Sequence, residues 1–284
     1  MKLLLTGKDG MLAKALQKNL PRDWTVFPFN KEQLNITDPV QVRNTIDRIR
    51  PDIIINTAAF TRVDDCETQK EIAFGINGVA VGTLAEMARS VHALLVHFSS
   101  DYIFSGNKGR PYLEDDTPNP LSVYGMSKWD GEKRIVASGC RFLVIRTQWL
   151  YGEGRNFIRT IRTMAMNRQE IHVVNDQIGS PTYTDDLACA TFAVLAQGGE
   201  GIFHLTNSGT CSWFDLAKTI IALSGLSTTV YPCATEAFPR PAPRPRYSAL
   251  SCEKVERLYR CRLRLWNEAV QSYLMDEKSV RSRS

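Results

Sequence analysis

Residues 1–20, MKLLLTGKDGMLAKALQKNL, begin with a short apolar run and pass through two glycines into a segment with helical spacing. The run 2–6 is typical of a β-strand, and the apolar positions of residues 11–20 predict a helix. Between them, Gly7 permits a tight turn, Gly10 permits close approach of the backbone, and the helix N-terminus supplies N–H donors for a pyrophosphate. The spacing G-x-x-G-x-x-A departs from G-x-G-x-x-G, so a plain turn between strand and helix stays an alternative.

The same alternation continues along the chain. Further strands are predicted at residues 24–29, 51–56, 93–99 and 142–147, and further helices at 39–50, 72–90 and 124–138. Strands that alternate with helices at this spacing indicate right-handed βαβ units. We therefore predict an α/β fold, a Rossmann-type doubly wound parallel sheet with a smaller C-terminal substrate domain. Residues 1–150 would form the dinucleotide-binding domain, its sheet completed by parts of 170–210, and residues 151–284 mainly a discontinuous substrate domain.

Composition excludes several classes of protein. The 284 residues carry a net charge of only +5, too mild and scattered to indicate binding to nucleic acid. No run of 18 apolar residues is present, so no membrane helix is expected, and the first residues do not resemble a signal peptide. Seven widely spaced cysteines without a C-x-x-C pair suggest reduced thiols and a cytoplasmic location. The four histidines lack metal-ligand spacing, so no metal is predicted.

The segment YGMSK at residues 124–128 indicates the chemistry. Tyr124 and Lys128 are four residues apart and share one face of a helix. A nearby ammonium would lower the pKa of a tyrosine toward the range in which it transfers protons. Such a pair is common by chance on a solvated helix face, but Ser100 follows an apolar strand and can hydrogen-bond a substrate carbonyl. Ser100, Tyr124 and Lys128 are therefore the predicted catalytic residues for ketone reduction with a nicotinamide cofactor.

The end of the second predicted strand bears on the choice of nicotinamide cofactor. An acidic residue there binds the ribose 2′-hydroxyl of NAD, whereas a basic residue accepts the 2′-phosphate of NADP. This chain has Asn30 and Lys31 at that point, with Glu32 next to them. NADPH is therefore the predicted cofactor, with NADH possible.

Taken together, these segments resemble the extended short-chain dehydrogenases and, among them, the dTDP-4-dehydrorhamnose reductase family. The similarity runs from residue 1 to about residue 274, with Ala13 standing where glycine is common and Asn30 where an acidic residue is often found. The segments that carry it are NTAAFTRVD (56–64), HFSSDYIFSG (97–106), RTQWLYG (146–152), DQIGSPT (176–182), GIFHL (201–205) followed by Ser212 and Trp213, and RPRYSAL (244–250).

The resemblance implies the following sites. The cofactor would contact Gly7, Asp9, Gly10, Met11, Leu12, Asn30, Lys31, Asp38, Ala58, Ala59, Phe60, Tyr124 and Lys128. The substrate would contact Val63, Ser100, Asp101, Tyr124, Trp149, Arg244 and Arg246. By the same resemblance Tyr124 is the proton donor, Lys128 its partner, Asp38 a neighbour of the adenine and Trp149 a contact of the sugar. The proline-rich segment 238–246 would be a loop on the substrate side, and Arg244 or Arg246 would bind a diphosphate.

The implied reaction is NAD(P)H-dependent reduction of the 4-keto group of dTDP-4-dehydro-6-deoxy-L-mannose to dTDP-L-rhamnose, a precursor of polysaccharides. The expected partner is a nucleotide sugar, with no nucleic acid and no membrane, and the expected state is a monomer or homodimer. Two alternatives remain: another nucleotide-sugar reductase, epimerase or dehydratase of the superfamily, and a dinucleotide-binding regulatory subunit with this fold. Of the other polar and aromatic residues, Asp64 is assigned to a solvated helix start and Trp213 to the core.

Overall fold

Six parallel strands form the central sheet in the order β10-β5-β4-β3-β1-β2. The computed structural model describes residues 1–281, with side chains to residue 277, so residues 282–284 of the predicted C-terminal domain lie outside the described residues. The strands are β1 (Lys2–Thr6), β2 (Thr25–Phe29), β3 (Ile53–Asn56), β4 (Leu94–Ser100), β5 (Arg141–Thr147) and β10 (Gly201–His204). The order along the sheet reverses beside β1, which lies between β2 and β3. Such a reversal opens a crevice at the carboxyl ends of the strands.

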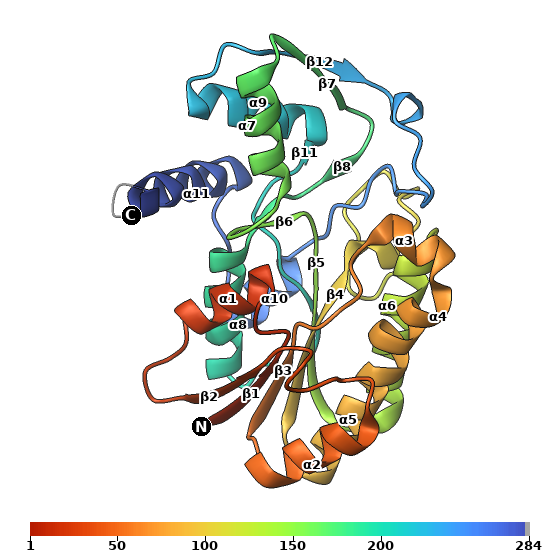
Figure 1. Ribbon diagram of the computed structural model, residues 1–284. Helices are drawn as coiled ribbons and strands as arrows, with labels where there is room; N and C mark the ends of the chain where they lie inside the picture. Colours follow the sequence, from red (N-terminus) through yellow and green to blue (C-terminus); the bar gives the residue numbers. More distant parts are fainter. Residues whose placement is uncertain (282–284) are drawn as a thin grey trace.

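Helices cover both faces of this sheet, as Figure 1 shows. One face carries α1 (Met11–Lys18), α8 (Thr184–Ala196) and α10 (Glu253–Tyr259). The other carries α2 (Pro39–Ile49), α5 (Ala80–Ser90) and α6 (Val123–Ser138). The strands in the middle of the sheet are mostly apolar because both of their faces are buried, and all four residues of β3 are buried. The predicted doubly wound α/β fold is confirmed.

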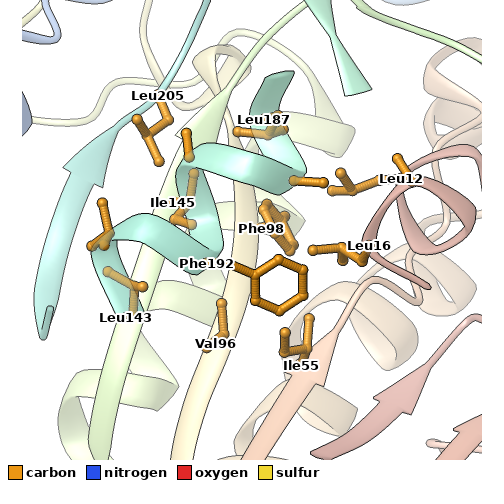
Figure 2. Packing of buried hydrophobic residues seen from close by; sticks show 14 of the residues in the cluster. Leu12, Leu16, Ile55, Val96, Phe98, Leu143, Ile145, Leu187, Phe192 and Leu205 are labelled. Carbon is orange, nitrogen blue, oxygen red and sulfur yellow. The ribbon is translucent and has the colours of Figure 1, made fainter. Parts of the chain in front are cut away.

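The packing between the sheet and the pair α1 and α8 is shown in Figure 2. Phe192 of α8 lies over Val96 of β4 and Ile55 of β3, and Leu16 of α1 packs beside it. Each side chain of this size contributes roughly 1.5–3 kcal/mol when it leaves water. This layer fixes α1, and therefore the glycine turn that precedes it, against the sheet.

A second, smaller lobe lies over the carboxyl ends of the strands (Figure 1). Its helices are α7 (Phe157–Asn167), α9 (Trp213–Ser224) and α11 (Trp266–Arg281), and its longer strands are β7 (Glu170–Val174) and β12 (Thr229–Cys233). Short strands join the two lobes: β6 (Leu150–Tyr151), β8 (Ile178–Gly179), β9 (Thr182–Tyr183) and β11 (Cys211–Ser212). Residues 184–204 return to the large lobe as α8 and β10. The assignment of the two regions to cofactor and substrate stays a prediction.

The predicted helix 72–90 is interrupted in the structure. It consists of α4 (Lys70–Phe74), a π-helical turn (Gly75–Val79) and α5. The interruption lies where α6 approaches closely, because a Cβ on Gly78 would come within 2.4 Å of Asp130. The wider turn directs the buried Asn77 to the backbone N–H of Phe60, at 2.8 Å, and to the Ser127 hydroxyl, at 3.0 Å. A further helix, α3 (Val63–Thr68), precedes α4, and it begins where the sequence predicted a helix start at Asp64.

Segment 238–246 contains neither helix nor strand, as its prolines predict. It runs beside the large lobe: a Cβ on Gly106 would come within 2.5 Å of Pro245. Among the described residues, every helix is too short or too polar to traverse a bilayer.

Candidate active site

The glycine turn after β1 meets the turn after β3 at the point where the sheet order reverses. Gly7 has φ +71°, and a Cβ there would come within 2.9 Å of the Ala58 backbone nitrogen. Gly10 is the N-cap of α1, so the N-terminus of this helix opens into the same crevice. A cavity of about 370 Å³ lies there. The close backbone approach and the open helix end fit the pyrophosphate of a dinucleotide.

The structure brings together most of the residues predicted to bind the cofactor. Gly7, Asp9, Gly10, Asn30, Lys31, Ala58 and Ala59 all line this cavity, as does Glu32. Lys31 is exposed at the end of β2, where a cation can meet a 2′-phosphate. Thr37 and Ile76 also line the cavity, although the sequence gave no reason to select them.

Six residues of the predicted cofactor set lie outside this cavity: Tyr124 and Lys128, which are described below, and four others. Leu12 is buried in the core beneath α1, and Met11 lines a different cavity, between α1 and α11. Asp38 is the N-cap of α2 and accepts hydrogen bonds from the backbone of Val40 and Gln41, both at 3.0 Å. Phe60 packs in a small apolar cluster beside Tyr124. The helix cap and the core packing explain these side-chain directions, so direct contact of the four with a cofactor stays a prediction.

Ser100 and Tyr124 meet at the carboxyl end of β4. The Ser100 hydroxyl donates to Asp101 Oδ1 at 3.0 Å and accepts from the backbone N–H of Tyr102 at 3.2 Å. Burial raises the pKa of the Tyr124 phenol, and the Ser100 hydroxyl beside it opposes that shift. Two hydroxyl groups thus converge on one point, as ketone polarisation and protonation require.

The start of α6 holds Tyr124 in place. Ser122 caps the helix by accepting from the backbone N–H of Gly125 at 3.2 Å. Gly125 itself lies against the Tyr102 carbonyl, which a Cβ there would approach to 2.1 Å. The rings of Tyr102 and Tyr124 pack edge to face with centroids 5.5 Å apart. A larger residue at 125 would therefore push the phenol of Tyr124 away from Ser100.

Lys128 is buried and turned toward the sheet. Its Nζ donates to the Phe98 carbonyl at 2.6 Å and lies 3.2 Å from His97 Nε2. Burial lowers its pKa to about 8, and Glu132 opposes that shift. The sequence argument expected Lys128 to lower the pKa of Tyr124. In this structure burial dominates instead and raises the Tyr124 pKa, so the expectation is wrong for this arrangement.

A buried ion pair anchors α6 one turn beyond Lys128. Arg146 of β5 bonds both carboxylate oxygens of Glu132, with Nη2 to Oε2 at 2.8 Å and Nε to Oε1 at 3.1 Å. Its Nη1 also donates to the Glu114 carbonyl at 3.0 Å. Such a paired fork fixes orientation as well as distance. The catalytic helix is thereby tied to the strand next to β4.

Buried polar atoms without partners gather at the ends of β4 and β5. Ser99 Oγ, Thr147 Oγ1 and Gln148 Nε2 have no hydrogen-bond partner within the part of the chain that is described. Asp101 lies beside them, and burial raises its pKa to about 6, with hydrogen bonds from Ser248 and Ser100 opposing. Unpaired buried polar groups are costly and often mark a ligand site. A polyhydroxylated ligand would satisfy this set.

Trp149 is held in a strained and crowded position. Its φ is +47°, and its ring stacks on Trp213 with centroids 3.6 Å apart. Gly179 lies against the other side, where a Cβ would come within 2.6 Å of the indole. Backbone strain of this kind in a tryptophan persists only where packing enforces it. Trp213, assigned to the core from sequence, is half-buried and forms part of this aromatic pair.

Of the remaining substrate candidates, Arg244 forms a half-buried ion pair, whereas Arg246 is exposed. Arg244 grips Asp64 with Nη1 to Oδ1 at 3.0 Å and Nη2 to Oδ2 at 3.1 Å. Asp64 does lie in the first turn of α3, as predicted, but this pairing was missed. Arg246 is 71% exposed in its side chain and pairs with Glu236 at 3.3 Å. Val63 is half-buried at the start of α3.

Metal-ligating side chains and a second cavity, considered over the described residues, also bear on the site. Within residues 1–281 no three His, Cys, Asp or Glu side chains converge in a way that could hold a metal ion. A larger cavity of about 550 Å³, lined in part by Arg110 and Arg262, includes none of the residues predicted from sequence. The convergent polar groups therefore mark the strand ends, not this larger cavity, as the candidate site.

Comparisons with known proteins agree with this geometry. The family described as RmlD substrate binding domain matches residues 1–279. The spore coat polysaccharide biosynthesis protein SpsK of Bacillus subtilis is 41% identical over 98% of this chain and 99% of its own. The dTDP-4-dehydrorhamnose reductase of Clostridium acetobutylicum has 39% identity and a TM-score of 0.96, covering 98% of this chain and 100% of that one. The Bacillus anthracis dTDP-4-dehydrorhamnose reductase, solved in complex with NADP, has 35% identity and a TM-score of 0.94, with coverage of 97% and 99%. Matches of this extent show that the chain belongs to the RmlD substrate binding domain family.

Proposed function

We propose that this protein is an NADPH-dependent oxidoreductase that reduces the 4-keto group of dTDP-4-dehydro-6-deoxy-L-mannose to give dTDP-L-rhamnose. The observation that carries the proposal is the position of Ser100 beside Tyr124 at the end of β4, near enough for its hydroxyl to affect the pKa of the phenol. The dinucleotide cavity lies at the same edge of the sheet, at the ends of β3 and β1, the next two strands after β4. A proton donor, a carbonyl-binding hydroxyl and a cofactor cavity at one sheet edge suit ketone reduction.

Each of these residues has its own role in the reduction. NADPH, when bound, supplies the hydride. The Ser100 hydroxyl donates to the keto oxygen and polarises it, and the Tyr124 hydroxyl gives that oxygen its proton as the alcohol forms. Ser99, Thr147 and Gln148 offer unpaired polar atoms to the sugar hydroxyls, and they exclude bulk water from this corner.

Lys31 supports NADPH over NADH, because it is the exposed cation at the end of β2 where the 2′-phosphate would lie. Glu32 beside it works against that preference. Fluorescence titration gives the dissociation constants for NADPH and NADH and shows which of the two binds more tightly. Tighter binding of NADH would contradict this part of the proposal.

The sugar and the nucleotide are supported by the names of relatives, two of which are dTDP-4-dehydrorhamnose reductases with more than 95% coverage of this chain. The competing function is reduction of another nucleotide-linked keto sugar. A regulatory role without catalysis is less consistent with the chain, because Ser100, Tyr124 and Lys128 are all present and Ser100 lies beside Tyr124.

One assay separates these functions. Purified protein is mixed with NADPH and dTDP-4-dehydro-6-deoxy-L-mannose, and NADPH absorbance is followed while the product is identified by mass spectrometry and NMR. We expect rapid oxidation of NADPH and formation of dTDP-L-rhamnose. Keto sugars carried on UDP or GDP serve as controls. Faster turnover of one of these would overturn the substrate, and no turnover of any would favour a binding role.

Tyr124→Phe tests the proton donor directly. Loss of a general acid typically costs about a hundredfold to ten-thousandfold in rate, and kcat should fall by that much. NADPH binding should change little, because phenylalanine keeps the ring and removes only the hydroxyl. Tyr231→Phe, at an exposed position of β12, is the matched control and should leave turnover unchanged. Near-normal turnover in Tyr124→Phe would show that Tyr124 is not the proton donor.

We further propose that the protein works in the cytoplasm, which its seven free cysteines support, and that it is a monomer or homodimer. Light scattering coupled to size exclusion will give the mass in solution. A tetramer or a higher assembly would contradict the proposed monomer or homodimer.

A further inference from the structure

The start of α9 places Trp213 beside Trp149. Ser212 of β11 pairs antiparallel with Ile178 of β8, so the residues that follow and precede them, Trp213 and Gln177, come to lie opposite each other. Ser212 also forms a capping box at the N-terminus of α9, which fixes the backbone of Trp213 as the first residue of the helix. The backbone position of Trp213 is therefore set by two local structures.

A directed chain of hydrogen bonds holds the side chain of Trp213. Its Nε1 donates to Gln177 Oε1 at 3.2 Å, and Gln177 Nε2 donates to Thr235 Oγ1 at 3.0 Å. Thr235 Oγ1 in turn donates to Asp176 Oδ1 at 2.7 Å. An indole N–H can only donate and a carboxylate can only accept, so the two ends of the chain fix the orientation of the Gln177 amide between them. Gln177 is 7% exposed, so water competes little for these bonds.

The ring of Trp213 in turn packs against Trp149. The two indoles stack with centroids 3.6 Å apart and 12° between their planes, and Phe157 of α7 contacts Trp213 with centroids 4.5 Å apart. The φ of +47° at Trp149 is costly, and such a conformation persists only where the surroundings enforce it. Trp213, which contacts both rings and is bonded through its N–H, supplies that packing.

The stacked pair borders the corner of unpaired polar atoms at the strand ends. A Cβ on Gly179 would come within 2.5 Å of Gln148 Oε1 and within 2.6 Å of the Trp149 indole, so both side chains lie against the same glycine. Gln148 Nε2 is one of the buried atoms without a partner. A movement of the Trp149 indole would therefore change the boundary of the space that the sugar is proposed to occupy.

We propose that Trp213 is a positioning residue: together with Gln177 it holds the Trp149 indole at the edge of the sugar site, and it thereby sets the affinity for the nucleotide sugar. The inference rests on the proposed function. Trp213 touches neither Ser100 nor Tyr124, so it contributes to binding of the sugar before and during the reaction equally. An interaction of this kind lowers KM and leaves kcat almost unchanged.

The same hydrogen bonds reach the segment expected on the substrate side. Thr235 begins the short 3-10 turn Thr235–Ala237, which directly precedes segment 238–246. Its backbone N–H also donates to Asp176 Oδ1, at 3.0 Å. One chain thus joins the aromatic pair to the start of this segment. The cavity assigned to the dinucleotide is lined by none of these residues, so binding of NADPH should not depend on them.

The first test observes the indole groups directly in the full chain without added ligand. Five tryptophans give five indole N–H signals after nitrogen-15 labelling, and Trp149→Phe and Trp213→Phe identify two of them. We expect the Trp213 N–H to be protected from exchange with water and to lose that protection in Gln177→Met. We expect the Trp149 signal to move downfield in Trp213→Leu, because the stacked ring shields it. An unprotected Trp213 N–H in the unaltered chain, or an unmoved Trp149 signal, would overturn the proposal.

The second test compares binding of the sugar with turnover. Trp213→Leu removes the stack and should raise KM for the nucleotide sugar about tenfold, with kcat within about twofold of the unaltered chain. Trp213→Phe keeps an aromatic ring and should recover part of the loss. Gln177→Met, which removes only the hydrogen bonds, should raise KM by about two- to fivefold. The dissociation constant of dTDP-L-rhamnose, measured by calorimetry, gives the same comparison without turnover, and that of NADPH should stay constant.

Trp24→Leu is the matched control. Trp24 is also a half-buried tryptophan in contact with one aromatic ring, Phe192, at 5.6 Å between centroids, but it lies just before β2, at the opposite edge of the sheet. This variant should lose stability in urea denaturation, as Trp213→Leu does, while its KM for the sugar stays the same. An equal rise of KM in the two variants would show that Trp213 acts only through stability.

Failure of this inference can be told from failure of the proposed function. If dTDP-L-rhamnose binds more weakly to Trp213→Leu but the unaltered chain reduces no keto sugar, the proposed function fails and the role of Trp213 stands. If the keto sugar is reduced and Trp213→Leu has an unchanged KM, the function stands and Trp213 is not a positioning residue. A fall of kcat as large as the rise of KM, or weaker binding of NADPH, would also contradict the inference.

Discussion

Asp101 is a carboxyl group that the fold buries although its charged form is poorly compensated there. It is 1% exposed, and burial raises its pKa from 3.8 to about 6. The ordinary place for such a group is the surface, so its presence at the end of β4 indicates a cost in stability that function explains.

Asp101→Asn should therefore make the protein more stable at neutral pH. Between pH 3.8 and about 6 the folded state binds the proton more tightly than the unfolded state, so stability falls as the pH rises through that window. Asparagine imitates the protonated form and avoids this loss. We expect a gain of up to about 3 kcal/mol in the free energy of unfolding above pH 6 and almost none near pH 4. Urea denaturation at several pH values measures it.

The exposed Asp115 provides the comparison, since Asp115→Asn alters the same type of side chain in water. It should change stability by less than about 0.5 kcal/mol at any of these pH values. A gain in Asp101→Asn that is the same at pH 4 and pH 7 would show that packing, not ionisation, is responsible.

Gly7→Ala tests the crevice at the same scale. At φ +71° a side chain is strained, and its Cβ would also lie 2.9 Å from the Ala58 nitrogen. Gly109 has a similar φ of +69° with nothing within 4 Å, so Gly109→Ala isolates the strain alone, about 1–2 kcal/mol. We expect Gly7→Ala to lose more stability than Gly109→Ala and to weaken NADPH binding at least tenfold. If the two variants weakened NADPH binding equally, the close approach of Gly7 to Ala58 would not contribute to binding of the cofactor.

At the scale of elements, the position of α6 decides whether Tyr124 meets Ser100. The helix is tied to β5 by Arg146 and Glu132, whose side chains are 3% and 4% exposed. Arg146→Met would leave the Glu132 carboxylate buried and unpaired, which typically costs about 3–5 kcal/mol. Thermal or urea unfolding measures this loss. The double change with Glu132→Leu should recover much of it, because no buried charge remains.

Arg141→Met is the matched control on the same strand. Arg141 pairs with Glu200 at 2.6 Å, but the two side chains are 62% and 40% exposed. Solvent screening limits such a pair to less than about 1 kcal/mol. Comparable losses in the two variants would mean that the buried pair does not anchor α6.

The elements of residues 1–147 were largely predictable from the sequence, whereas those that follow were not predicted one by one. Apolar runs such as residues 51–56 and the glycine turn at Gly7 depend on local patterns, and the strands and helices they predict are present within one to three residues. The interruption at 75–79 was not predictable, because it depends on the approach of Asp130 from a distant helix. Periodicity reports which face of an element is buried, not which partner lies against it.

The candidate site divides in the same way. Ser100, Tyr124 and Lys128 were identified from residue type and spacing, and the structure brings Ser100 and Tyr124 together. The hydrogen bond of Lys128 to a strand carbonyl was not foreseen. Nor was the role of Trp213 beside Trp149, since the two are 64 positions apart and only the fold makes them neighbours. Position at the carboxyl end of a parallel strand was the one signal that could have selected Ser99 and Thr147.

At the scale of the molecule, the two lobes meet over the strand ends and segment 238–246 links them (Figure 1). Arg244 attaches this segment to α3 through both oxygens of Asp64 and also donates to the Ala242 carbonyl at 2.8 Å. Burial opposes ionisation of Asp64, but the hydrogen bonds from Arg244 and Ala242 prevail and lower its pKa. The link therefore persists as an ion pair over the whole range in which the protein would work.

Arg244→Lys tests whether this link shapes the site for the nucleotide sugar. A lysine cannot bond both carboxylate oxygens in the plane of a guanidinium, so the segment should loosen where it borders the strand ends. We expect KM for the nucleotide sugar to rise about tenfold, equivalent to about 1.4 kcal/mol, while the dissociation constant for NADPH stays the same. Arg262→Lys, which alters an exposed pair with Glu256, should change neither. An unchanged KM in Arg244→Lys would show that the segment only joins the lobes, and a parallel loss of NADPH binding would show that it supports the whole crevice rather than the substrate side.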